Sequence, residues 1–231
     1  MYSVVKGKTY DIWIYLPDNY STSALSYPTI YVLDADADQE FVASTCKKVS
    51  DEVNTQNVIV VGIHYGDNRN VDYTPTTTSM GRGEAETFLN FINKELIPRI
   101  QRDFRADTLR SKRIIIGHSF GGLFGAYAFT KHNDVFGNYL LLSPSLFYDN
   151  TITLKYEQEL RNVIKDKPQL VFIGAGSTEE ALLPANDLFY QRLLNFYPFT
   201  KTEFHLVAGK GHLSSKNENI QEAIKFYFKN R

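Results

Sequence analysis

The residues with the clearest chemical potential surround Ser119, in the sequence Gly-His-Ser-Phe-Gly at positions 117–121. This G-x-S-x-G motif follows an apolar run at 114–116 and precedes a helix-like segment at 123–129, so it fits a sharp turn between a strand and a helix. On such a turn, side chains two residues before or after the serine would collide with the flanking elements, which explains the glycines. The pattern predicts an exposed, nucleophilic Ser119, and the alternative is a structural turn whose serine caps the helix.

A serine hydroxyl is a weak nucleophile at neutral pH, so Ser119 needs a general base, usually a histidine. In proteins with this kind of turn the base comes last in the chain, which leaves His205 and His212 of the five histidines. His205 falls inside a predicted strand, where a packed histidine is expected. His212 follows the C-terminal end of that strand, where α/β folds place their ligands, so we predict His212 as the base. The alternative is a solvated loop histidine. The remaining histidines are expected to be structural, with the side chain of His118 turned away from the nucleophile: His64, His118 and His132.

The acid that orients His212 should lie between the nucleophile and the base in the chain, in the loop after a strand predicted at 169–174. That loop contains Glu179 and Glu180, and Asp187 is a weaker candidate inside the following helix. Glu179 comes late enough in the loop to reach across before the helix begins, whereas a helical Glu180 would point roughly 100° away. We therefore predict Glu179 as the acid and keep Glu180 as the alternative. The structural interpretation is that each glutamate only favours a helix N-terminus.

An acyl-transfer reaction also needs two backbone N–H donors for the oxyanion that develops. One is the N–H of Phe120, the residue after the nucleophile. The other should come from an upstream loop that follows an apolar strand, where Asp36 is the better position and Ala35 the alternative. The alternate spacing of Asp34, Asp36 and Asp38 also suggests calcium, but the glycine and the distal glutamate of an EF-hand loop are missing, so no metal is expected.

These residues must be positioned by the elements around them, and apolar runs alternate with helical periodicity along most of the chain. This alternation is typical of parallel strands joined by crossover helices. Runs such as Val-Ile-Val-Val at 58–61 and Leu-Leu-Leu at 140–142 are apolar at successive positions, as expected for strands covered on both faces. The predicted fold is therefore α/β, an α/β-hydrolase fold with a central, mostly parallel sheet and helices on both faces. Strands are predicted at 10–16, 29–33, 58–64, 112–117, 138–143, 169–174 and 202–208.

Two covering helices are predicted from apolar residues that recur at helical spacing. One runs from Phe88 to Phe104 with an apolar residue every four positions, and the other lies near the C-terminus, from Ile220 to Phe228. Pro98 falls inside the first pattern and lacks a backbone N–H, so we expect a kink or a break there.

The composition of the chain limits the number of domains, the partners and the disulfide bonds that we expect. With 231 residues, 43% of them hydrophobic, the chain suits a single domain over 1–231 with a full core. The 25 basic and 26 acidic residues leave a net charge of −1, so neither nucleic acid nor an anionic membrane is an expected partner. Cys46 is the single cysteine, which excludes an intrachain disulfide and predicts a buried, inert thiol.

The N-terminal segment lacks a hydrophobic signal core, and no apolar run approaches the ~18 residues needed to span a bilayer. The chain is therefore expected to be soluble: cytoplasmic as it stands, and periplasmic or secreted if a leader was removed. The sequence does not indicate an oligomeric state.

Further groups of residues form a combined pattern that is much more specific than G-x-S-x-G alone. They are Tyr-Leu-Pro at 15–17, Tyr-Val-Leu-Asp at 31–34, Arg69 with Asp-Tyr-Thr-Pro at 72–75, Phe-Leu-Asn-Phe-Ile at 88–92 with Glu-Leu-Ile-Pro at 95–98, the serine motif, and Gly-His at 211–212. Together they resemble the putative-esterase family of α/β-hydrolases, which includes esterase D, the enterochelin (siderophore) esterases and feruloyl or acetyl carbohydrate esterases. The serine motif followed by Ser-Pro-Ser-Leu at 143–146 resembles the siderophore-esterase branch in particular. Two positions depart from the pattern: Ala35 stands where relatives often have glycine, and the acid loop has no unambiguous match.

The resemblance implies ester hydrolysis through an acyl-serine intermediate on Ser119, with His212 as the base and with no metal or organic cofactor. It also implies a small-molecule ester substrate, a catecholate trilactone or a related ester. The alternatives are a feruloyl or acetyl carbohydrate ester, a Ser/His dyad without an acid and, in another class, a catalytically silent hydrolase fold used as a binding protein. A peptidase is disfavoured because the chain shows no propeller or lid domain.

Arg69 falls beside the end of a central strand, where it is expected to bind an anionic or catecholate group of the substrate. The alternative is a salt bridge to Asp67 or Asp72.

Overall fold

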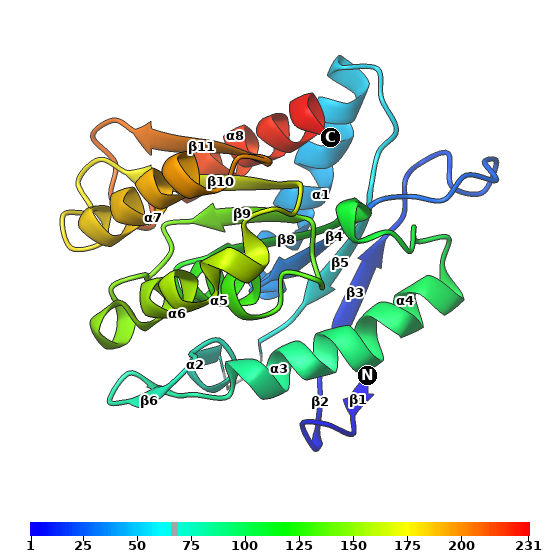
Figure 1. Ribbon diagram of the computed structural model, residues 1–231. Helices are drawn as coiled ribbons and strands as arrows, with labels where there is room; N and C mark the ends of the chain where they lie inside the picture. The colour runs from blue at the N-terminus through cyan, green and yellow to red at the C-terminus, as the bar shows by residue number, and fades with distance from the viewer. Residues whose placement is uncertain (66–68) are drawn as a thin grey trace.

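The computed structural model describes residues 1–65 and 69–231, and at its centre the described residues build a seven-stranded sheet (Figure 1). The strand order is β11-β10-β9-β8-β4-β5-β3. Neighbouring strands pair in parallel except β3 and β5, which are antiparallel. The strands are β3 (Ile12–Tyr15), β4 (Thr29–Leu33), β5 (Ile59–Ile63), β8 (Arg113–His118), β9 (Asn138–Leu142), β10 (Gln169–Gly176) and β11 (Thr200–Val207).

All seven predicted strands are present, and their ends lie within two residues of the predicted ones. Every residue of β4, β5 and β9 is buried, which is why their sequences are continuous apolar runs. β11 forms one edge of the sheet, and most of its residues are partly or fully exposed. The predicted α/β-hydrolase fold with a mostly parallel central sheet is confirmed.

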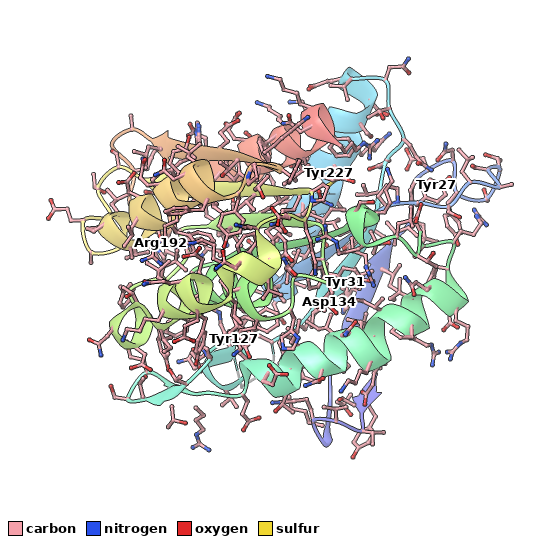
Figure 2. All side chains as sticks on the ribbon, viewed as in Figure 1. Tyr27, Tyr31, Tyr127, Asp134, Arg192 and Tyr227 are labelled. Atoms are coloured by element: carbon pink, nitrogen blue, oxygen red, sulfur yellow. The ribbon has the colours of Figure 1, made fainter. Side chains whose placement is uncertain are left out.

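Helices cover both faces of the sheet, and each face has its own hydrophobic core (Figure 1). On one face, α1 (Ala35–Glu52) and α8 (Lys216–Asn230) share a buried cluster with Ile30 and Val32 of β4. Tyr31, the residue between them (labelled in Figure 2), belongs to the core of the other face; it is 1% exposed, and its ring lies edge-on to that of Phe136. The helices on that second face are α3 (Ala85–Phe91), α4 (Ile97–Asp103), α5 (Phe120–Lys131), α6 (Tyr148–Ile164) and α7 (Leu183–Phe196).

The interruption predicted at Pro98 takes the form of a widened helical turn. α3 continues into a π-helical turn, η1 (Ile92–Leu96), and α4 follows directly with Pro98 in its first turn. Proline has no N–H, and its ring would clash with the carbonyl group four residues earlier, so a wider turn lets the helix continue past it. The C-terminal helix is present as predicted and forms α8.

Short elements complete the fold around the carboxyl ends of the strands and the N-terminus. Asp72, which is 1% exposed, accepts hydrogen bonds from Lys8 Nζ (2.6 Å) and Tyr10 Oη (2.8 Å) and pairs with Lys6 Nζ (2.8 Å). These bonds hold the N-terminal hairpin against α2. The short elements are β1 (Tyr2–Ser3), β2 (Lys8–Thr9), α2 (Arg69–Asp72), β6 (Thr77–Thr78), β7 (Gly81–Arg82) and η2 (Arg110–Lys112).

Cys46 lies in α1 and is buried, as predicted. Burial raises the pKa of its thiol to about 12, so the thiolate that reacts with oxidants and metals is scarce at neutral pH. Among the helices of the described residues, we find none with the length and apolar character needed to cross a membrane.

Candidate active site

Ser119 lies at the turn between β8 and α5 with φ 60° and ψ −116°. A positive φ is costly for a serine, on the order of 1–3 kcal/mol, and such strain is typical of functional sites. The predicted collision is present at Gly117, where a Cβ would lie 2.6 Å from the backbone of Gly121. A Cβ on Gly121 would meet the Asp34 carboxylate at 3.3 Å, a tight contact and not a collision, and the next close approach is at Gly122, where a Cβ would lie 2.9 Å from Pro144. The motif thus forms the strand, turn and helix geometry that its sequence predicts.

The nucleophile candidate has a second serine beside it. Ser119 Oγ lies 3.4 Å from Ser145 Oγ, and the Ser145 N–H donates to the Ser119 carbonyl oxygen (3.2 Å). Phe120 is the first residue of α5, so its N–H has no acceptor within the helix and is available to an oxyanion, as predicted for this position.

His212 lies in the loop between β11 and α8, and its ring is fixed by an acid. Its Nδ1 is 2.7 Å from Glu179 Oε2, and Glu179 lies in the loop between β10 and α7. Both loops follow the carboxyl ends of neighbouring parallel strands, which explains how residues far apart in the sequence meet. Of the three acids considered from the sequence, the structure brings Glu179 to His212, whereas Glu180 and Asp187 are exposed and Asp187 accepts a bond from Gln191 within α7.

Glu179 is 6% exposed and accepts several hydrogen bonds besides that of His212. Its Oε1 accepts from the Gly176 N–H (2.5 Å), from Ser143 Oγ (2.8 Å) and from Ser215 Oγ (3.3 Å). Burial alone would raise the pKa of Glu179, but the bonds from His212, Gly176 and Ser143 outweigh burial and lower it. The acid is therefore a carboxylate at neutral pH, able to stabilise a positive charge on His212.

His118, the variable residue of the serine motif, does not point away from the site as expected. Its ring lies against the ring of His212, with centroids 4.5 Å apart, and its Nε2–H donates to the His212 carbonyl oxygen (2.8 Å). Burial, reinforced by the closeness of His212, lowers the pKa of His118 to about 4. The expectation was wrong because β8 carries its last side chain toward the loop that follows β11, a contact that the local motif does not encode.

Arg69 is engaged in an ion pair, although not with the partners named from the sequence. Its Nε and Nη2 donate to the two carboxylate oxygens of Asp34 (2.8 and 2.9 Å), and Nη2 also donates to the His118 carbonyl oxygen (3.0 Å). Asp72 is instead bound by the N-terminal hairpin, and Asp67 lies outside the described residues. The guanidinium thus joins the loop after β4 to the residue that precedes Ser119.

The candidate oxyanion loop begins with Asp34, which is buried and has φ 54°. Burial raises the pKa of Asp34, an effect that the hydrogen bonds from Arg69 offset only in part. Ala35 and Asp36 are the first residues of α1, so their N–H groups have no acceptor within the helix, and both positions stay open as the second donor. The Asp36 carboxylate turns the other way, toward His64 Nδ1 (2.8 Å) and the Tyr65 N–H (3.2 Å).

The three aspartates considered as calcium ligands each contact a basic or imidazole side chain. Arg69 binds Asp34, His64 binds Asp36, and Lys216 Nζ lies 2.5 Å from Asp38. Within residues 1–65 and 69–231, no group of three or more His, Cys, Asp or Glu side chains is arranged to hold a metal ion.

Several residues of this cluster were not identified from the sequence. Ser143 and Ser215 support Glu179, and Asp34 binds Arg69. The Ser-Pro-Ser-Leu motif at 143–146 was the available signal for Ser143, which has a positive φ of 41° directly after β9. Ser215 carried no signal, and the motif that contains Asp34 gave no indication of its contact with Arg69, since the partners of both residues lie far away in the chain.

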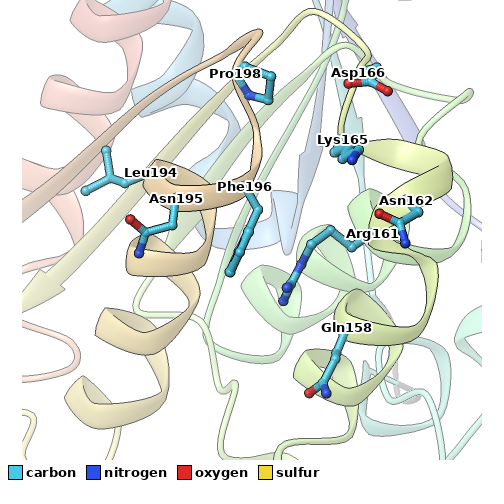
Figure 3. A pocket seen from close by; sticks show the side chains of 9 residues that line it. All are labelled: Gln158, Arg161, Asn162, Lys165, Asp166, Leu194, Asn195, Phe196 and Pro198. Atoms are coloured by element: carbon cyan, nitrogen blue, oxygen red, sulfur yellow. The ribbon is translucent and has the colours of Figure 1, made fainter.

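A cavity of about 530 Å³ lies at the other end of the strands, between the C-terminal halves of α6 and α7 (Figure 3). Polar and basic side chains, among them Arg161, Lys165 and Asn195, line it together with Phe196. None of the candidate site residues lines this cavity.

The mostly parallel sheet, the strained serine between β8 and α5, and the histidine–carboxylate pair at the carboxyl ends of β10 and β11 define an α/β-hydrolase. A model of the family described as Putative esterase matches residues 3–223 of the chain. The chain therefore belongs to this family, and it is a carboxylic ester hydrolase.

The chain is also similar to individual esterases and serine hydrolases, in sequence and in structure. The chain is 28% identical to ferri-bacillibactin esterase BesA of Bacillus subtilis in an alignment 249 residues long, gaps included, which covers 96% of this chain and 85% of that protein. The crystal structure of the BES protein from Bacillus cereus superposes with a TM-score of 0.87 at 29% identity, over 98% of this chain and 92% of that chain. An IroE-like serine hydrolase from Shewanella oneidensis gives a TM-score of 0.85 at 27% identity, over 99% of this chain and 78% of that chain.

Proposed function

We propose that the chain is a serine esterase in which Ser119 is the nucleophile, His212 the general base and acid, and Glu179 the residue that orients His212. The observation that carries this proposal is the 2.7 Å bond between His212 Nδ1 and Glu179 Oε2. A carboxylate at that distance holds the proton on Nδ1, which leaves Nε2 free to accept the proton of the serine.

The reaction proceeds in two displacements. Ser119 Oγ attacks the ester carbonyl carbon while His212 Nε2 takes the hydroxyl proton. The Phe120 N–H, with that of Ala35 or Asp36, donates to the oxyanion, and the intermediate collapses to an acyl-serine as the leaving alcohol takes the proton from His212. Water then attacks the acyl group, losing its proton to His212, and the second intermediate collapses as His212 returns that proton to Ser119 Oγ and the carboxylic acid is released. No step requires a metal or an organic cofactor.

We further propose that the substrate is a siderophore ester, a catecholate trilactone or a related ester. The serine motif and the Ser-Pro-Ser-Leu segment support this assignment, and so does the similarity to ferri-bacillibactin esterase BesA over 96% of the chain. A feruloyl or acetyl carbohydrate ester is the second candidate within the family. We also infer that residues 1–231 act as one domain, because strands from Ile12 to Val207 share one sheet.

Two substitutions test the assignment of the nucleophile and the base. Ser119→Ala and His212→Ala should each lower kcat for p-nitrophenyl acetate by several orders of magnitude, because the two residues act as one unit. Circular dichroism should show that both variants fold. A folded variant that keeps more than about a tenth of the wild-type kcat contradicts the assignment, and a wild-type chain that hydrolyses no ester supports a silent binding protein.

A substrate panel tests the chemical class. We expect kcat/KM for ferric bacillibactin to exceed that for methyl ferulate and for an acetylated xylo-oligosaccharide, with Ser119→Ala as the blank in every assay. A higher value for either of the other two substrates assigns the enzyme to the carbohydrate-esterase alternative.

A further inference from the structure

His118 is held on both its backbone and its side chain by residues of the candidate site. Its carbonyl oxygen accepts a hydrogen bond from Arg69 Nη2 (3.0 Å), and its Nε2 lies 2.8 Å from the carbonyl oxygen of His212. The residue is 6% exposed, and its ring lies 4.5 Å from the ring of His212, centroid to centroid. The residue before the nucleophile therefore contacts the loop that carries the base.

The protonation state of His118 follows from its partner. A carbonyl oxygen only accepts hydrogen bonds, so the proton of the neutral ring must be on Nε2. Burial, the nearby His212 and the positive charges of Lys216 and Arg69 all disfavour a charged ring, and they lower the pKa of His118 to about 4. His118 is thus a neutral donor at neutral pH, and it adds no positive charge next to His212 when that ring takes up the serine proton.

The loop that carries His212 is bound to the loop after β10 on one side, where Thr178 Oγ1 donates to the Lys210 carbonyl oxygen (2.9 Å) and the Gly209 N–H donates to Ser177 Oγ (2.8 Å). These bonds stop short of His212 itself, whose carbonyl oxygen is bound by His118. Ala208, Gly209 and Lys210 are exposed, as are Leu213 and Ser214 on the other flank of His212. Glu179 binds one atom of the His212 ring, Nδ1, and a single bond leaves the ring free to swing about that contact. The bond and the ring contact from His118 act on His212 itself, on its carbonyl oxygen and on the face of its ring.

We propose that His118 is a positioning residue for the base: its Nε2–H fixes the backbone of His212, and its ring fixes the plane of the His212 imidazole toward Ser119. This inference rests on the proposed function, since it concerns the same base. Positioning of this kind acts on kcat, because a displacement of about 1 Å in a reacting group costs up to roughly 10²-fold in rate.

Two substitutions separate the hydrogen bond from simple packing. His118→Phe keeps a ring but removes the donor, and we expect kcat for p-nitrophenyl acetate to fall roughly 10- to 100-fold with little change in KM. His118→Gln places an amide donor at nearly the same reach, and we expect it to restore kcat to within about 3-fold of wild type. In NMR spectra, the low-field proton of the bond between His212 and Glu179 should broaden in the Phe variant and persist in the Gln variant.

His205→Phe is the matched control, because His205 is a partly exposed histidine of β11, next to Phe172 and outside the site. It should leave kcat unchanged. If His118→Phe does not fold, His118→Asn replaces it, since the shorter amide does not reach the carbonyl of His212 and must show the same loss.

Either of two results overturns the proposal: a folded donor-free variant with wild-type kcat, or equal losses in the Phe and Gln variants. Ser119→Ala in the same assay keeps this outcome distinct from failure of the proposed function. If Ser119→Ala retains hydrolysis, the proposed function fails and the positioning role fails with it; if Ser119→Ala is inactive and His118→Phe is fully active, only the positioning role is lost.

Discussion

Glu179 is the residue whose role depends most on contacts made through folding. It lies next to a second glutamate in the sequence, and composition alone does not separate the two. The choice of Glu179 rested on the reach of its loop, and the structure adds what no local pattern contains: the donors Ser143, Gly176 and Ser215 around Oε1. Ser119 and His212 were predicted from a motif and from chain order, which can be read along the sequence, whereas the supporting serines are assembled from separate loops.

The pair of glutamates gives a matched test. Glu179→Gln should lower kcat for p-nitrophenyl acetate by roughly 10²- to 10⁴-fold, because the amide no longer stabilises the imidazolium and disturbs the tautomer of His212. Glu180→Gln should change kcat little, since Glu180 is exposed. A large loss in Glu180→Gln or Asp187→Asn moves the role to that residue, and wild-type rates in all three variants indicate a Ser/His dyad.

At the scale of elements, apolar patterning predicted the strands and the two helices well because burial on both faces of a sheet leaves a strong local signal. Strand order and the antiparallel direction of β3 were not predicted, because they arise from pairing between distant segments. The same limit applies to the loop after β4. Its connection to α2 and β8 through Arg69 and Asp34 joins three elements that are separate in the sequence.

The bonds of Arg69 to Asp34 and to the His118 carbonyl oxygen lead to a prediction about its substitution. Arg69→Ala should lower kcat for p-nitrophenyl acetate and for ferric bacillibactin by similar factors, roughly 10- to 100-fold, because it releases the loop that we propose supplies the second oxyanion donor. Arg82→Ala is the control, since Arg82 is an exposed arginine of β7. A loss confined to ferric bacillibactin supports instead the role that the sequence suggested, direct binding of an anionic or catecholate group.

For the molecule as a whole, the stability of the fold depends on pH through its buried titratable groups. The pKa of His118 falls from its ordinary value of 6.5 to about 4, so the folded chain binds fewer protons than the unfolded chain between these values. The free energy of unfolding should therefore decrease as the pH falls from 6.5 toward 4, by up to about 3 kcal/mol. The lowered pKa values of Glu179 and Glu157 stabilise the fold above the ordinary carboxylate range, and that contribution is lost at lower pH as these groups protonate.

Urea unfolding at several pH values checks this prediction. The wild-type chain should lose stability between pH 6.5 and 5, and His118→Gln should show a flatter dependence in that window because glutamine does not titrate. Equal slopes in the two proteins would place the effect on other groups.

Because the residues of the candidate site lie far apart in the sequence, they are synthesised at different times. His118 and His212 are separated by 94 positions, and β11, which leads to His212, pairs only with β10 among the described strands. At roughly 5–20 residues per second, a ribosome adds His212 roughly 5 to 20 seconds after Ser119. With the roles proposed for Ser119 and His212, the nascent chain holds during that interval a serine with no proton acceptor, and we expect ester hydrolysis to begin only when the last strand and helix have joined the fold.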